Sequence, residues 1–133
     1  MGQLREIEPE IEAAGFQWFG IAPETVSRMK ETKVKYNLKA HLLSDSQMTA
    51  ARAFRIAYEV DQETLADLKS HGVDLEAASG QKHHQLPVPS VYVVDTSGRI
   101  QFAYVNPDYT VRLHPQLLLA ALRTLGVRPV VNA

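Results

Sequence analysis

Cysteine is absent from the 133 residues of the chain. The thiolate of cysteine is the nucleophile of thiol chemistry and a strong zinc ligand, and two thiols make a disulfide. The residues of this chain therefore cannot form a disulfide, carry out a thiol redox cycle or bind a metal through cysteine. No other absence in the composition excludes as much chemistry.

The chain also lacks an excess of charge of either sign. Lysine and arginine total 14 against 15 acidic residues, which gives a formal net charge of −1. Such a balance creates no overall field that would attract nucleic acid or anionic lipid, so neither is an expected partner. No apolar run approaches the ~20 residues of a membrane span. The first six residues lack the layout of a secretion signal, and we expect a cytoplasmic location.

Glycine-rich phosphate-binding patterns are missing as well. The seven glycines form neither a G-x-G-x-x-G nor a Walker pattern, so we expect no nucleotide-type cofactor. No G-x-S-x-G turn surrounds any serine, which leaves a serine nucleophile without its strained turn and oxyanion donors. The sequence therefore predicts no cofactor and no catalytic residue.

What is present is the length and the 45% apolar content of one compact domain, residues 1–133. Hydrophobic periodicity predicts alternating helices and strands. In chain order the expected elements are a helix at 1–14 ended by Gly15, a strand at 16–21, a helix opened by Pro23, a strand at 41–43, a helix after Ser44, a helix after Asp61 ended by Gly72, strands at 91–94 and 99–105, and a helix from Pro115 closed by Gly126. This order predicts an α/β fold with helices layered on a mixed sheet.

Local signals add detail to this outline. Ser44 and Gln47 have the spacing of a capping box, and Asp61 is a good N-cap residue. We expect an exposed loop at 73–85, where the periodicity disappears, and positive φ at Gly98 between the last two strands. Along the helix opened by Pro23, the side chains expected to face the core are Val26, Met29 and Val34. The next two helices carry the apolar residues Met48, Ala51, Phe54, Leu65 and Leu68.

Five strings in a fixed order give the chain a family resemblance. They are GIAPE at 20–24, LLSD at 42–45, LPVPSVYVVD at 86–95, SGRI at 97–100 and NPDYT at 106–110. With these strings the chain resembles the thioredoxin-like superfamily, and within it the alkyl hydroperoxide reductase and thiol-specific antioxidant group, the peroxiredoxins and their relatives. The resemblance implies a thioredoxin-like mixed sheet flanked by helices. It also implies an antioxidant oxidoreductase that reduces peroxides or exchanges thiols and disulfides.

The resemblance further implies a reactive cysteine that this chain does not have. In such proteins a buried strand leads into a loop that carries the cysteine at a helix N-terminus, where backbone N–H groups lower the thiol pKa. Here the chain starts inside that helix, so we expect the domain to be incomplete at its N-terminus. A thiolate must attack the peroxide oxygen, so we expect this chain to be inactive by itself. A thiol reductant is an expected partner only if a cysteine-bearing segment precedes Met1.

The missing strand has a structural consequence. By analogy with the family, it would lie between the strands at 17–21 and 91–95, and its loss leaves two strand pairs with unpaired inner edges. Three outcomes are open: the two edges close on each other, a second chain donates a strand, or the fragment needs its missing half. We favour closure or exchange within a homodimer. The alternative function is accordingly a non-catalytic interaction or structural module that forms a homodimer.

Five positions mark where the family's active site would lie. The resemblance puts Val88 and Pro89 opposite the cysteine, with Ala22, Pro23 and Glu24 on the neighbouring loop. In this chain they would form a vestigial groove. Pro89 resembles the cis-proline of thioredoxins and is expected to be cis, with a trans proline that ends the preceding loop as the alternative.

Histidines and carboxylates offer a metal-site alternative. His83 and His84 are adjacent, His71 lies upstream, and Asp74 and Glu76 stand between them. Imidazoles and carboxylates bind zinc, copper or nickel, but no histidine pair has the i, i+4 helical spacing. We favour a solvated polar loop and expect no metal.

Three further groups have a catalytic or binding alternative beside a structural one. Ser44 and Asp45 with a histidine could serve a hydrolase, although helix capping by Ser44 explains them better. Asp108 and Arg112 could pair, or Arg112 could receive an anion, although a turn with Pro107 and Asp108 before the last helix is the favoured interpretation. The third group is Trp18 and Phe19. Both are expected to lie in a buried strand as part of the hydrophobic core, and not to stack on the bases of a nucleic acid.

Overall fold

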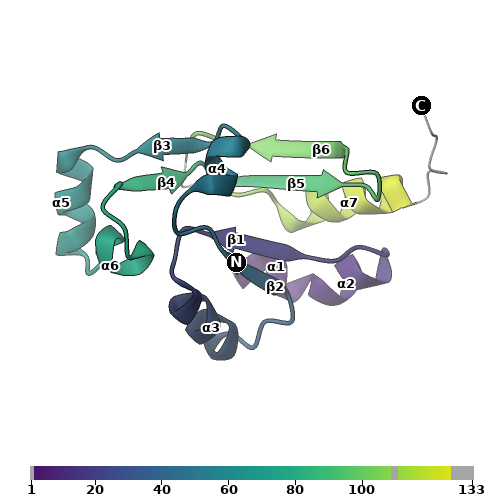
Figure 1. Ribbon diagram of the computed structural model, residues 1–133. Helices are drawn as coiled ribbons and strands as arrows, with labels where there is room; N and C mark the ends of the chain where they lie inside the picture. Colours follow the sequence, from purple (N-terminus) through teal and green to yellow (C-terminus); the bar gives the residue numbers. More distant parts are fainter. Residues whose placement is uncertain (1, 109–110, 127–133) are drawn as a thin grey trace. The chain divides into compact units, whose positions relative to one another are not determined.

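The computed structural model describes residues 2–108 and 111–126, and the chain divides into two compact units. The terminal unit comprises Met1–Trp18 and Pro89–Ala133, and the central unit comprises Phe19–Val88. The elements labelled in Figure 1 are α1 (Gly2–Glu6), α2 (Glu8–Ala13), β1 (Phe19–Ala22), α3 (Val26–Lys35), β2 (His41–Ser44), α4 (Thr49–Ala53), β3 (Ala57–Glu59), α5 (Gln62–Ser70), α6 (Leu75–Ser79), β4 (Gln85–Pro87), β5 (Ser90–Val94), β6 (Ile100–Val105) and α7 (Pro115–Gly126).

The terminal unit is built on an apolar cluster. Helix α7 contributes leucines three and four positions apart, which lie on one helix face. The buried members of the cluster are Ile7, Ile11, Val93, Leu113, Leu118, Leu119 and Leu122. Partly buried residues that pack against the cluster include Phe16, Trp18, Phe102 and Tyr104. The expected C-terminal helix is thereby confirmed, and so is the place of Trp18 against a core.

The hairpin of β5 and β6 is also confirmed. The two strands pair antiparallel from Ser90 opposite Val105 to Val94 opposite Ile100, with an irregularity at Val93/Val94. Gly98 in the turn has φ +84°, a conformation that glycine adopts without the steric cost of a Cβ. The carboxylate of Asp95 fixes this turn, because its Oδ1 accepts the backbone N–H groups of Ser97 and Arg99 at 2.8 and 3.0 Å.

The expected N-terminal helix is interrupted. It divides into α1 and α2 at Ile7, whose N–H donates to Leu4 O at 3.2 Å. Pro9 stands in the first turn of α2 and has no N–H to continue the i to i−4 ladder of a longer helix. Ile7 and Ile11 still face the core, and Gly15 takes positive φ after α2, as expected.

The central unit begins with a parallel pair of strands. β1 and β2 run side by side from Phe19 opposite His41 to Ala22 opposite Ser44. Helix α3 packs against β2 and buries Met29. On β1, Gly20 is buried, while its neighbours Phe19 and Ile21 are 52% and 49% exposed. The sheet is therefore covered on one face and open on the other.

Two expectations for this region are wrong. The first strand starts at Phe19 and not at 16, and Phe19 is exposed, with its ring stacked on His41 at 5.0 Å between centroids. Helix α3 begins after Thr25, whose Oγ1 accepts the N–H of Arg28, so Pro23 precedes the helix instead of opening it. The helix therefore begins later and presents a different face from the one expected.

Helices α3 and α4 bury fewer apolar side chains than the sequence predicts. Val26 and Val34 are 59% and 81% exposed, because the face of α3 that packs on the sheet centres on Met29. Of the apolar residues assigned to the next helix, Met48 and Ala51 are buried, whereas Phe54 lies just after α4 and is exposed. The middle helices thus contribute fewer core residues than their apolar content suggests.

The loop expected at 73–85 contains structure. Asp74 accepts the N–H of Ala77 at 3.2 Å and caps the short helix α6. The segment ends in β4, which pairs antiparallel with β3 from Ala57 opposite Pro87 to Glu59 opposite Gln85. The expected helix after Asp61 is confirmed as α5, with Asp61 Oδ1 accepting the N–H of Thr64 at 2.7 Å.

The strands of the described residues form three two-stranded sheets, β1–β2, β3–β4 and β5–β6. Parallel and antiparallel pairing both occur, as a mixed α/β fold requires. In that part of the chain β1 has β2 as its one neighbour strand and β5 has β6. Each therefore keeps an edge that no strand of the described chain pairs.

Candidate functional site

The loop at Ala22–Glu24 leaves the end of β1 and is held by its backbone. The carbonyl of Ala22 accepts the N–H of Asp45 at 2.8 Å, and the carbonyl of Glu24 accepts the hydroxyl of Ser44. One residue further, Thr25 donates its N–H to Ala78 O at 2.9 Å. β2 and α6 therefore fix the three loop residues predicted for the groove, all of which are half-buried.

Val88 is the last residue of the central unit in the sequence, and hydrogen bonds that run through α4 connect it to this loop. Its N–H donates to Ile56 O at 2.7 Å, and the N–H of Ile56 donates to Ala51 O at 3.0 Å. Ala51 in turn donates its N–H to Asp45, the residue bonded to Ala22. A continuous set of hydrogen bonds thus joins the two predicted segments.

Pro89 differs from its predicted geometry. The Val88–Pro89 peptide bond is trans, so the expectation of a cis-proline is wrong. Trans is the more stable isomer of an X–Pro bond by ~0.5–1 kcal/mol. Pro89 is the first residue of the second segment of the terminal unit, and its carbonyl accepts the N–H of Asn106 at 3.2 Å.

The chemistry that these five positions offer is limited. Ala22, Pro23, Val88 and Pro89 carry no polar side-chain atom, and Glu24 brings one carboxylate. Several of their backbone groups already bond within the chain. The positions can shape an apolar surface and accept hydrogen bonds, but they supply no soft nucleophile and no acid–base pair.

Ser44 and Asp45 act structurally. Ser44 uses its hydroxyl on Glu24 O, so the capping role predicted for Ser44 is wrong. Asp45 caps α4 instead: its two carboxylate oxygens accept the N–H groups of Ala50 and Ala51 at 3.0 and 2.9 Å. Met48, directly before α4, has φ +61° and gives the helix no side-chain cap. This use of both oxygens leaves the pair without the geometry of a hydrolase.

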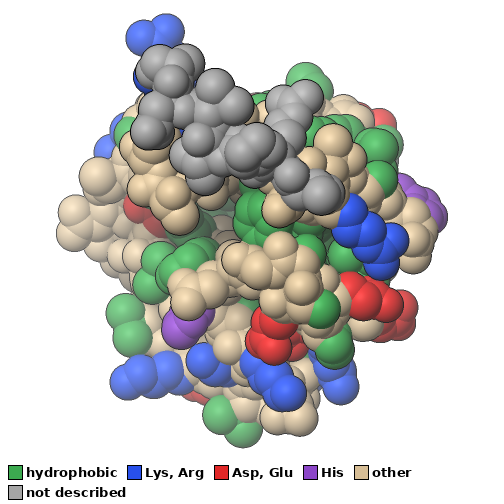
Figure 2. Space-filling view, turned by 90° about the vertical axis from the view of Figure 1, so that its right-hand side faces the viewer, with side chains coloured by type: hydrophobic (Ala, Val, Ile, Leu, Met, Phe, Trp, Pro, Cys, Tyr) green, Lys and Arg blue, Asp and Glu red, His purple; other side chains and the backbone are tan. Residues whose placement is uncertain are grey.

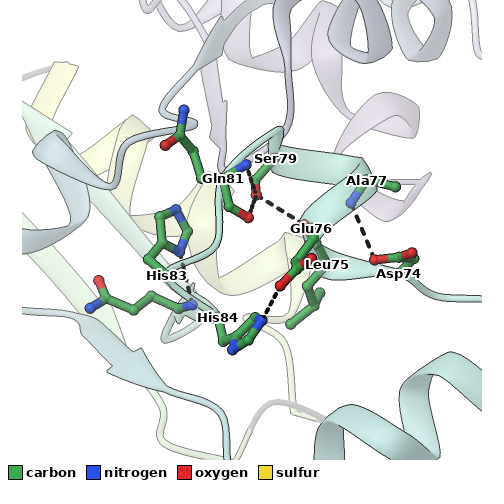
Figure 3. A network of polar contacts seen from close by, with 9 residues as sticks. Asp74, Leu75, Glu76, Ala77, Ser79, Gln81, His83 and His84 are labelled. Atoms are coloured by element: carbon green, nitrogen blue, oxygen red, sulfur yellow. Dashed lines mark hydrogen bonds and ion pairs between the residues drawn. The ribbon is translucent and has the colours of Figure 1, made fainter.

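The histidines separate onto different partners, and Figure 3 shows the contact of His84 with Glu76. His84 Nε2 lies 2.6 Å from Glu76 Oε1, while His83 Nε2 lies 2.8 Å from Ser46 O. His71 Nδ1 lies 2.8 Å from the carbonyl of Asp67. In residues 2–108 and 111–126 no three histidine or acidic side chains are grouped as a metal site would need.

A shallow pocket lies beside the His84–Glu76 pair, between α5 and α6. Its volume is about 270 Å³, and the lining residues are Gln62, Leu65, Ala66, Lys69, Val73, Asp74, Leu75, Glu76 and His84. His84 has φ +51°, an uncommon conformation for a residue with a side chain. The His84–Glu76 pair combines an imidazole with a carboxylate. The other carboxylate of the pocket, Asp74, uses its Oδ1 to accept the N–H of Ala77 and so caps α6.

Sequence reasoning missed two of these roles. Asp45 follows a strand and precedes a helix by a few residues, which is a signal for a capping carboxylate, but the neighbouring Ser44 competes for the same role. The pairing of His84 with Glu76 depends on α6, which interrupts the segment interpreted as a loop. Its signal was the sequence Asp74-Leu75-Glu76, an N-cap followed by an acidic first turn.

Asp108 and Arg112, the two residues considered as a pair or, for Arg112, as an anion site, lie after β6. Asp108 donates its N–H to Asn106 Oδ1 at 3.0 Å, and its carbonyl accepts the N–H of Val111 at 3.0 Å. These bonds agree with the turn expected before the last helix. Tyr109 and Thr110 of the NPDYT string lie outside the described residues.

Solved structures of similar backbone define the fold class. The chain matches the crystal structure of peroxidoxin BcpB from Mycobacterium tuberculosis with a TM-score of 0.65 and 17% sequence identity, over 96% of this chain and 68% of that one. It matches a mutant of peroxiredoxin 6 from Arenicola marina with a TM-score of 0.64 and 12% identity, over 93% of this chain and 52% of that one. The fold is thioredoxin-like, of the peroxiredoxin type, and the chain spans about half to two thirds of these structures.

The family follows from the sequence itself. The model of the AhpC/TSA family matches residues 1–103, so the chain belongs to the AhpC/TSA family and the predicted resemblance is confirmed. No curated protein matches the chain in a sequence search. Among the described residues, no helix has the length and apolar character required to cross a bilayer.

Proposed function

We propose that residues 1–133 form one peroxiredoxin-like domain that does not itself reduce peroxides and acts as a non-catalytic association module. Membership of the AhpC/TSA family supports an oxidoreductase ancestry of this scaffold. The observation that carries the proposal is the complete absence of cysteine from these residues. The surface around Ala22–Glu24 and Val88 is then a vestigial groove that retains apolar shape without a thiol.

Peroxide reduction breaks the O–O bond. Its reduction requires a nucleophile that takes one oxygen as a sulfenic acid, leaves the other as water or an alcohol, and is then regenerated by a thiol. Methionine can also accept one oxygen, but it becomes a sulfoxide that a dithiol does not recycle in the absence of a reductase. The three methionines of the chain can therefore consume peroxide stoichiometrically and cannot turn it over.

A peroxidase assay tests this part of the proposal. The purified chain is mixed with excess hydrogen peroxide and dithiothreitol, with an active AhpC/TSA peroxiredoxin as positive control. We expect peroxide loss at the rate of buffer alone after at most three equivalents per chain, the number of methionines. Sustained turnover that persists through repeated purification would overturn the proposal. Mass spectrometry separates the two cases, because methionine oxidation adds one oxygen to each modified residue.

The association role is supported by the open face of the β1–β2 sheet. Partner residues of neighbouring strands point to the same side, so Phe19, Ile21, His41 and Leu43 share one face, and all four are exposed. Parallel sheets are normally covered on both faces, and this one exposes three large apolar side chains. We propose that a second copy of the chain covers this face in a homodimer in the cytoplasm.

Sedimentation velocity tests the homodimer. At micromolar concentration we expect a species of twice the chain mass at high salt, where apolar contacts persist. Leu43→Lys should convert it to a monomer because a charge is buried at the contact, while Leu117→Lys on an exposed turn of α7 should not. A wild-type monomer under these conditions contradicts the homodimer and leaves the peroxidase result unaffected.

A further inference from the structure

Helix α3 and the residues after it carry a concentration of positive charge. Between residues 28 and 39 there are five cations and one carboxylate, Glu31. The cations are Arg28, Lys30, Lys33, Lys35 and Lys39, and all five are exposed. Figure 2 shows lysine and arginine side chains gathered along the lower edge of the molecule, the level at which α3 lies in Figure 1.

This basic surface has features that a merely solvated helix face lacks. Within residues 2–108 and 111–126 both ion pairs found involve histidine, so none of the five cations is neutralised by a carboxylate there. Two exposed valines accompany the cations on α3: Val26 lies just before Arg28, and Val34 lies between Lys33 and Lys35. Valine is a poor choice for an exposed helix position, because its branched side chain loses rotamer freedom and gains no burial.

A surface of opposite charge exists elsewhere on the same chain. The segment from residue 5 to residue 12 contains four glutamates and one arginine, Arg5. Glu6, Glu10 and Glu12 are exposed, while Ile7 and Ile11 point into the core of the terminal unit. None of these three carboxylates forms an ion pair within the described residues.

We propose that the basic surface of α3 docks on the acidic surface of α1–α2 of a second copy of the chain. Complementary potentials favour the encounter and fix the orientation of the partners, and the exposed valines supply apolar contact area beside the charges. The contact joins two different surfaces, so it is head-to-tail and distinct from the face of β1–β2. It rests on the proposed association role and adds a second, salt-sensitive contact to it.

The test uses salt to separate the two contacts. Sedimentation velocity is run at about 0.01 M salt, where the screening length is ~30 Å, and at about 1 M, where it is ~3 Å. We expect an assembly at low salt that is larger than the species at high salt. If the same species is found at both salt concentrations, the docking proposal is overturned. A dimer at both leaves the homodimer through β1–β2 intact. A monomer at both also contradicts the homodimer. A monomer at high salt and a larger species at low salt supports the docking contact alone.

Charge reversal locates the contact. Lys30→Glu with Lys33→Glu, and separately Glu10→Lys with Glu12→Lys, should each weaken the low-salt association by about tenfold or more, because attraction becomes repulsion. A mixture of the two variants should restore it, since each reversed surface then meets its complement. Lys69→Glu with Lys82→Glu changes the net charge equally on exposed residues outside the contact and should leave the association unchanged. Equal weakening by this control, or no restoration on mixing, overturns the proposal, and circular dichroism of each variant checks that it is folded.

Discussion

The two units of the chain reach their structure by different means. In the terminal unit, seven buried apolar residues from α2, β5, α7 and the connections beside these elements form one cluster. The buried apolar side chains of the central unit, such as Met29 on α3 and Met48 before α4, are not members of that cluster, and the β1–β2 sheet is open on one face. The first unit can be stabilised by its own core. The second depends more on capping carboxylates and on whatever covers its open face.

This difference agrees with the proposed role. A surface that has no thiol can be retained for binding, and binding surfaces of soluble domains expose apolar groups that a self-sufficient core would bury. The exposed groups of the central unit include Phe19, Ile21 and Leu43 on the sheet and Val26 and Val34 on α3. They lie in the unit that also carries the basic surface.

Leu119→Ala should give the largest effect and tests the idea that the terminal unit has a core of its own. Leu119 is 1% exposed, and its truncation should lower the free energy of unfolding by about 2–5 kcal/mol through lost burial and a cavity. Urea denaturation followed by the fluorescence of Trp18, the one tryptophan, reports this unit because Trp18 packs against the cluster.

Leu117→Ala is the matched control in the same helix. Leu117 is 53% exposed, so the same chemical change should alter the unfolding free energy by no more than about 0.5 kcal/mol. Equal effects of the two substitutions would mean that α7 does not pack as described and that the comparison between the units fails.

Asp45→Ala should have the next largest effect and acts on the central unit. It removes the acceptors of two N–H groups at the start of α4, those of Ala50 and Ala51, which should cost about 1–2 kcal/mol. Amide hydrogen exchange measures it directly: protection at these two residues should fall by roughly tenfold or more. Ser46→Ala leaves both acceptors in place and should change neither. Unchanged protection in Asp45→Ala would show that the cap does not hold the helix.

The parts of the fold that the sequence predicts well are those with local signals. The β5–β6 hairpin has two apolar strands, a short turn and Gly98, and α7 has a leucine spacing that fits one helix face. The strands β3 and β4 have three residues each and pair across about 25 residues of chain, so their existence depends on a long-range contact that no local pattern contains.

The candidate site divides in the same way. The order of its strings predicts the family correctly, but not the isomer of the Val88–Pro89 bond, because the two isomers differ in energy by only ~0.5–1 kcal/mol. The faces of α3 were misassigned because Val26 and Val34 fit an apolar stripe, although they are exposed. An apolar residue at helical spacing indicates a contact without indicating whether the contact lies within the chain.

The smallest expected effect on stability comes from Asp95. Like Asp45, it is a carboxylate that directly follows a strand. The side chain of Ser97, the backbone N–H of Arg99 and the side chain of Gln101 donate to it and lower the pKa of Asp95 from 3.8 to about 2. Because the folded pKa is depressed, this stabilisation is complete above pH 3.8 and is lost as the pH falls through about 2. Its size is limited by the exposure of the turn to solvent.

The titration of Asp95 can be followed by the chemical shift of its carboxyl carbon, whose midpoint we expect near pH 2. In the variant Asp95→Asn, the unfolding free energy should decrease less steeply between pH 3.8 and 2 than in the wild type. A midpoint near 3.8 would mean that the donors of Ser97, Arg99 and Gln101 do not hold the ionised form. The hairpin turn would then depend on Gly98 and strand pairing alone, and the terminal unit would owe its stability to the apolar cluster without a contribution from this carboxylate.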